Sequence, residues 1–142
     1  MQSFQVRLQE ASGLPELLAA SFDTFEAIRQ EAGSRVDEVP ELFAAFMTTG
    51  VTAVEGREAV TAAPSLPPGP AGPQPSLLTA DASLNEAIDT LADLGALLDS
   101  CLTQAAASAT NPQDRAACEQ AADAAHQIRH LMARDDDAPG LR

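Results

Sequence analysis

Hydrophobic residues recur at intervals of three and four along most of the chain, the spacing that places them on one face of an α-helix. The first stretch is ambiguous, because Phe4, Val6 and Leu8 alternate as in a strand, whereas Phe4 and Leu8 also keep helical spacing. We interpret this stretch as a short helix that ends at Ser12-Gly13. The longer stretches predict four further helices.

Two of these helices lie in the N-terminal half. Pro15 opens the first, since a proline in the first turn costs no hydrogen bond, and Gly33 marks its predicted end. The second begins near Asp37, with Pro40 inside its first turn, and ends near Ala63. Its apolar residues cover roughly half of the helix circumference. We therefore expect it to contact more than one neighbouring helix.

The C-terminal half contains the other two helices. Ser83 and Glu86 have the spacing of a capping box, although Asp81 is an alternative cap, and Asn111 precedes Pro112 as a helix cap would. The helix that begins after Ser83 carries a heptad-like apolar seam at Leu84, Ile88, Leu91, Gly95, Leu98 and Leu102. The second carries a seam of smaller residues at Ala117, Ala121, Ala124, Ile128 and Leu131. The short break between them predicts an antiparallel hairpin that packs closely through alanine.

A proline-rich segment separates the two halves. Residues 64–77 contain six prolines and no charge, a composition typical of an extended linker. We therefore divide the chain into an N-terminal helical hairpin (1–63), the linker (64–77), a C-terminal helical hairpin (78–134) and a disordered acidic tail (135–142). The predicted fold is all-α, with the two antiparallel hairpins packed as a four-helix bundle. Gly50 and Gly95 lie on apolar helix faces, where we expect each to permit a close helix crossing.

Composition and charge limit the partners. The net charge of −13 and the pI near 4.2 argue against nucleic acid and anionic membranes and favour a basic protein. Alanine is abundant, whereas Phe occurs five times and Trp and Tyr are absent, so we expect a thin core that is stabilised by self-association or a partner. All eight basic residues are Arg, a bias typical of GC-rich bacterial genomes. With no signal-peptide pattern at the N-terminus and no apolar stretch of transmembrane length, we expect a cytoplasmic protein.

Two histidines and two carboxylates share one stripe of the last helix. Glu119, Asp123, His126 and His130 follow at intervals of four, three and four, on the side opposite the alanine seam. Histidine and carboxylate at helical spacing can bind zinc or another divalent ion, although a stable site needs a further ligand from another element. The alternative interpretation is a solvated polar face.

His126 also suggests a different chemistry. The string His126-Gln127-Ile128-Arg129, an exposed helical histidine with a basic residue three positions later, resembles the phosphoacceptor of histidine-phosphotransfer domains, which are four-helix bundles. It resembles more distantly the H-box of sensor kinases. The resemblance covers four or five residues, and His130 stands where these domains have a small residue. It implies that His126 accepts a phosphoryl group.

The two cysteines flank the apolar seam of the C-terminal hairpin. With the turn near Asn111, Cys101 and Cys118 fall within about a turn of each other, so they form a possible thiol pair. In a reducing cytoplasm, two small and partly buried thiols are the other interpretation.

The sequence favours a non-catalytic protein. It has no Lys or Tyr, no glycine-rich phosphate loop and no nucleophile elbow, and nothing in it calls for a cofactor. We predict an acidic helical protein–protein interaction module, an adaptor, chaperone or antitoxin-like binder of a basic partner. The apolar residues that we expect to face either the core or that partner are Phe43, Phe46, Met47 and Val54.

Overall fold

The computed structural model describes residues 4–67, 77–78 and 81–133. These residues form α1 (Phe4–Glu10), α2 (Leu14–Arg35), the 3₁₀ turn η1 (Pro40–Leu42), α3 (Phe43–Thr61), α4 (Leu84–Ser108) and α5 (Pro112–Leu131). No strand occurs in this part of the chain, which confirms the all-helical prediction. None of its helices is long and apolar enough to cross a membrane. Most of the predicted linker and the whole predicted tail lie outside the described residues.

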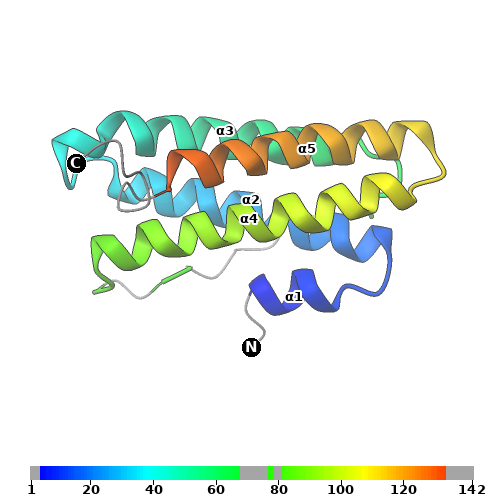
Figure 1. The fold of residues 1–142 in the computed structure, drawn as a ribbon, viewed down its shortest axis with the longest axis horizontal. Helices are drawn as coiled ribbons and strands as arrows, with labels where there is room; N and C mark the ends of the chain where they lie inside the picture. The colour runs from blue at the N-terminus through cyan, green and yellow to red at the C-terminus, as the bar shows by residue number, and fades with distance from the viewer. Residues whose placement is uncertain (1–3, 68–76, 79–80, 134–142) are drawn as a thin grey trace, which may run out of the picture.

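The four long helices lie side by side, and α1 lies against two of them (Figure 1). α5 packs against both α4 and α3, and α3 packs in turn against α2. This confirms that the helix containing Phe46 contacts more than one neighbour. Contact between α2 and α4 is slight, and α1 touches both of these helices. α1 therefore covers the side on which α2 and α4 have little contact.

α1 is held in place by its side chains. A seven-residue helix is unstable alone in water, so its conformation depends on docking. Phe4 and Leu8 are buried in the core, and Arg7 forms an ion pair of 2.8 Å with Asp23 of α2. The Arg7 guanidinium also lies 5.9 Å from the centroid of the Phe4 ring, within range of a cation–π contact.

α2 continues two residues past Gly33, so the predicted end of this helix was wrong. Its last turn contains Arg35, which is buried and pairs with Glu31 at 2.7 Å and with Glu38 at 3.3 Å. A buried charge is costly unless it is paired, so the helical geometry that brings Glu31 to Arg35 is favoured. These ion pairs outweigh the low helix propensity of Gly33.

The start predicted for the next helix, near Asp37, was also wrong. Helical structure begins at Pro40, as the 3₁₀ turn that leads into α3 at Phe43. Val39 is extended, with φ −135° and ψ 118°, because a residue before proline avoids the helical region. Pro40 thus begins the helical segment instead of lying within it.

The helix caps predicted in the C-terminal half are confirmed. Glu86 N donates to Ser83 Oγ at 3.1 Å, and Ser83 N donates to Glu86 Oε1 at 3.1 Å, so both bonds of the capping box form. Asn111 caps α5 by accepting hydrogen bonds from the backbone N–H groups of Gln113 and Asp114, at 2.7 and 3.3 Å. The apolar seams between these caps are largely buried, with Leu91, Leu98, Leu102, Ala121 and Ile128 fully inaccessible.

Glycine permits close helix approach at two positions. A Cβ on Gly95 would lie 2.9 Å from Arg129 N and 3.0 Å from Ala125 O, so only glycine lets the α5 backbone come this near to α4. This confirms the prediction for Gly95. Gly56, which the sequence analysis did not single out, makes room for the ring of Phe25 between α3 and α2. The prediction for Gly50 was wrong, because nothing lies within 4 Å of a Cβ there.

An ion-pair network also joins α2 to α3. Glu26 accepts hydrogen bonds from Arg29 on its own helix and from Arg57 on α3. The Arg29 hydrogen bond, together with those from Arg57 and Gln30, lowers the pKa of Glu26 from 4.5 to about 2 against the opposing effect of burial. Glu26 is therefore ionised at neutral pH and ties Arg57 to α2.

The glycine contacts predict opposite effects of two similar substitutions in α3. We expect Gly56→Ala to lower the free energy of unfolding by about 1–3 kcal/mol, because the added methyl group overlaps the buried Phe25 ring. Gly50→Ala is the matched control and should raise it by about 0.5–1 kcal/mol, since its methyl group enters open space. Urea unfolding measures both, and equal values would contradict the packing of Phe25 against α3.

Candidate functional site

α3 exposes a row of large apolar side chains. Phe43, Met47 and Val51 follow one another at intervals of four, and 47%, 48% and 56% of their surface remains accessible. Residues four apart lie one above the other on a helix, so the three form a continuous line, here called the α3 stripe. Scattered apolar side chains are common on protein surfaces, whereas three in a row on one helix make the α3 stripe a candidate contact surface.

The structure divides the apolar patch that the sequence analysis placed on this helix. Phe46 is 1% exposed and belongs to the core, whereas Phe43 and Met47 are exposed and Val54 is half-buried. Val51, which was not part of that predicted patch, completes the stripe. The wide apolar arc of α3 therefore serves two purposes, since one side packs on α2 and α5 and the other faces solvent.

Two carboxylates follow the α3 stripe along the same side of α3. Glu55 lies one turn beyond Val51, and Glu58 about one turn further, and both are exposed. With Asp123 of α5 they line a groove of about 360 Å³ between α3 and α5, here called the acidic groove. Its other lining residues are small or neutral: Ala59, Ala62, Gln120, Ala124 and Gln127. The groove therefore presents negative charge next to the α3 stripe.

The predicted histidine stripe is on the solvent side of α5. Glu119, Asp123, His126 and His130 are all exposed, and the rings of His126 and His130 meet edge to face with centroids 4.9 Å apart. His126 has a partner that the sequence analysis missed, because Nδ1 lies 3.3 Å from Oδ2 of Asp99 on α4. These two residues line a cavity of about 720 Å³ together with Glu119, Asp123 and Arg115.

The histidine stripe gains no further metal ligand from the residues that the structure describes. Among them, no group of three or more His, Cys, Asp or Glu side chains is placed to hold one metal ion. The contact with Asp99 does orient the His126 ring, as a phosphoacceptor would require. Yet Glu119 and Asp123 line the same cavity, and a phosphoryl group there would be repelled by their charge.

The two cysteines are free thiols in different surroundings. Cys118 is fully buried, and burial raises its pKa, with further contributions from Asp114 and Glu119. Cys101 is half-buried, and its Sγ points to the Leu8 carbonyl oxygen of α1, 3.9 Å away. Burial raises the pKa of Cys101 as well, so both thiols stay protonated at neutral pH. The possible thiol pair stays a prediction.

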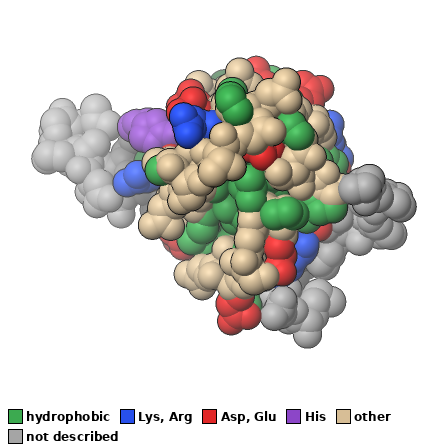
Figure 2. Space-filling model, turned by 90° about the vertical axis from the view of Figure 1, so that its right-hand side faces the viewer, with side chains coloured by type: hydrophobic (Ala, Val, Ile, Leu, Met, Phe, Trp, Pro, Cys, Tyr) green, Lys and Arg blue, Asp and Glu red, His purple; other side chains and the backbone are tan. Residues whose placement is uncertain are grey.

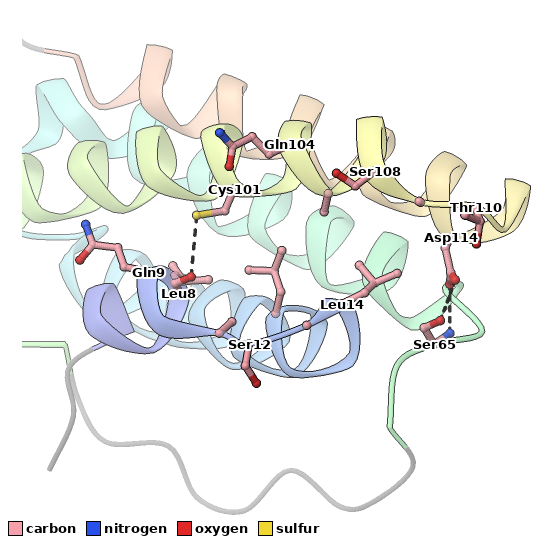
Figure 3. A pocket seen from close by; sticks show the side chains of 15 residues that line it. Leu8, Gln9, Ser12, Leu14, Ser65, Cys101, Gln104, Ser108, Thr110 and Asp114 are labelled. Carbon is pink, nitrogen blue, oxygen red and sulfur yellow. Dashed lines mark hydrogen bonds between the residues drawn. The ribbon is translucent and has the colours of Figure 1, made fainter.

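A third hollow opens beside α1. Seen from the end at which α1 leads into α2 and α4 leads into α5, hydrophobic side chains gather at the middle of the face (Figure 2). Here a groove of about 700 Å³ reaches from Leu8 and Cys101 to Ser65 and Asp114 (Figure 3). We call it the Cys101 groove. Its residues come from α1, the α1–α2 loop, α2, α4, the start of α5 and the segment after α3.

Comparison of the chain with protein-family models, with curated proteins and with solved structures found no match. The sequence marked Phe43 and Met47 of the stripe, but it contained no signal for Asp99 or for the Cys101 groove. Those sites combine segments far apart in the chain.

Substitution of a buried and an exposed phenylalanine of α3 tests which part of the predicted apolar patch belongs to the core. We expect Phe46→Ala to lower the free energy of unfolding by about 3–5 kcal/mol, because it leaves a cavity in the core. Phe43→Ala should change it by less than about 1 kcal/mol, since nearly half of that side chain is already exposed. Urea unfolding of both variants is the measurement. A large loss in Phe43→Ala would show that the stripe supports the fold and is not free to bind.

Proposed function

We propose that this chain is a non-catalytic acidic interaction module that binds a basic protein through α3 and the adjoining side of α5. In this proposal two antiparallel helical hairpins, joined by the proline-rich linker, form a four-helix bundle that acts as a rigid support in the bacterial cytoplasm. The observation that carries it is the α3 stripe running into the acidic groove.

The stripe supplies the apolar part of such a surface. Its three side chains form a line that a partner helix or strand can follow, as in recognition modes that read residues one turn apart. Phe46, beneath it, is buried and keeps α3 anchored to the core. The stripe thus offers apolar area that the fold itself does not use, and burying it against a partner is favourable.

The acidic groove defines the charge of the partner. Glu55, Glu58 and Asp123 lie together in it, and Arg57 on the same helix is already paired with Glu26. The net charge of −13 adds a long-range attraction for cations. A fitting partner presents apolar side chains for Phe43, Met47 and Val51, followed by Arg or Lys for the groove. Charge complementarity of this kind speeds association and excludes acidic proteins.

Recovery of partners at two salt concentrations tests the proposal. The tagged chain should retain a stoichiometric basic protein from the source organism at low salt and release it at high salt, because exposed charge pairs are screened. We expect Met47→Ser/Val51→Ser to lose this protein and Glu55→Gln/Glu58→Gln to bind it weakly even at low salt. Mass spectrometry of the retained fraction provides the measurement.

A matched control separates local from overall charge. Asp81→Asn/Asp93→Asn removes the same number of exposed carboxylates away from the groove and should leave binding close to wild type. Recovery of the chain alone would contradict the proposal. So would a partner that all of these variants retain equally.

Phosphotransfer through His126 is the second candidate, favoured by its contact with Asp99. If Nδ1–H donates a hydrogen bond to Asp99, Nε2 is the nitrogen left to attack the γ-phosphorus of ATP bound to a separate kinase, and the P–O bond to the leaving ADP breaks. Acid-labile phosphate should then appear in the wild type and in His130→Gln, fall in Asp99→Asn and vanish in His126→Gln. Equal labelling of all four proteins, or of none, would exclude this function.

A further inference from the structure

The Cys101 groove extends between two contacts that join segments far apart in the chain. At one end lie Leu8 and Cys101, where α1 meets α4, and at the other Asp114 is joined to Ser65 (Figure 3). Ser65 N donates to Asp114 Oδ1 at 3.0 Å, and Ser65 Oγ donates to Asp114 Oδ2 at 2.6 Å. A hollow of about 700 Å³ between these two contacts has the size of a small-molecule site.

The lining is apolar at its floor and polar but neutral at its rim. The floor is formed by aliphatic side chains: Leu8, Ala11, Leu14, Leu17, Ala105 and Ala109. Hydroxyl and amide groups surround it, namely those of Gln9, Ser12, Gln104, Ser108 and Thr110. Ligand pockets typically combine a mostly apolar wall with a few polar groups that orient the ligand, and a volume of about 700 Å³ falls in their usual range.

The groove offers no positive charge. Its ionisable lining residues are Cys101 and Asp114. The Cys101 thiol is protonated at neutral pH, because burial raises its pKa, and both oxygens of the buried Asp114 are occupied by Ser65. Together with the net charge of −13, this disfavours an anionic ligand such as a fatty-acid carboxylate. No free carboxylate in the lining calls for a cation either.

We propose that the Cys101 groove binds a neutral, mainly apolar small molecule, whose hydroxyl or carbonyl group is held by Gln104 or Ser108. This site is separate from the α3 stripe and the acidic groove, since the three share no lining residue. It therefore adds a ligand to the proposed function and does not depend on the identity of the protein partner.

The neutral fluorescent probe N-phenyl-1-naphthylamine tests this site on the full chain. It should bind saturably, one molecule per chain, and slow the alkylation of Cys101 by N-ethylmaleimide several-fold, as followed by peptide mass spectrometry. Cys118 should stay unmodified with or without the probe, since it is fully buried. Decanol should displace the probe, whereas decanoate at the same concentration should not.

Two variants of α4 connect the binding to the groove. Ala105→Leu fills the floor and should weaken probe binding about tenfold, equivalent to about 1.4 kcal/mol. Ala107→Leu adds the same group to an exposed position on the same helix and should bind as the wild type does. Circular dichroism should give both variants the helix content of the wild type, so that a loss of binding reports on the groove.

Several results would overturn the proposal. These are probe binding that does not saturate, equal affinity in Ala105→Leu and Ala107→Leu, and Cys101 alkylation at the same rate with and without the probe. Equal displacement by decanoate and decanol would overturn the preference for a neutral ligand. Each of these outcomes is independent of the salt-dependent partner test, so failure of one proposal does not imply failure of the other.

Discussion

The close packing of α5 against α4 and α3 is the constraint on which the rest of the molecule depends. The inner side of α5 is lined by alanine, and Gly95 admits its backbone to α4 without a side chain between them. Small residues bury little area each, so the contact depends on short distances between many atoms. Because Ala121, Ala125 and Ile128 are fully buried, the opposite side of α5, with Glu119 and Asp123, faces solvent. Asp123 on that side lines both the acidic groove and the cavity beside His126.

The same packing explains why some apolar residues of α3 remain exposed. α3 contacts α2 on one side and α5 on another, and Phe46, Ala53 and Val60 satisfy these contacts. Gly56 accepts the Phe25 ring, which lets α3 lie close to α2. Phe43, Met47 and Val51 therefore remain outside. Single exposed apolar or acidic side chains are common on protein surfaces, whereas here the α3 stripe adjoins the acidic groove.

How much the sequence predicted depended on the distance over which each interaction acts. Ser83 with Glu86 and Asn111 with Asp114 are contacts within one turn, and both helix starts were predicted correctly. The boundaries at Gly33 and Asp37 were predicted wrongly although their causes are also local: Arg35 pairs with Glu31 one turn away, and Val39 is extended because it precedes Pro40. Hydrophobic periodicity found the apolar arc of α3 but could not say which part faces inward. The Asp99–His126 contact and the Cys101 groove join segments far apart in the chain, so no local sequence pattern predicted them.

Site-specific crosslinking in cells of the source organism tests the central claim most directly. A photoreactive amino acid would replace Met47 in the stripe, and in a second protein Asn85, an exposed residue of α4 outside the stripe and the acidic groove. We expect the probe at position 47 to crosslink one basic protein and the probe at position 85 not to do so. Glu55→Gln/Glu58→Gln should reduce the yield at position 47. A crosslink at position 47 only to a second copy of this chain, or the same products at both positions, would contradict it.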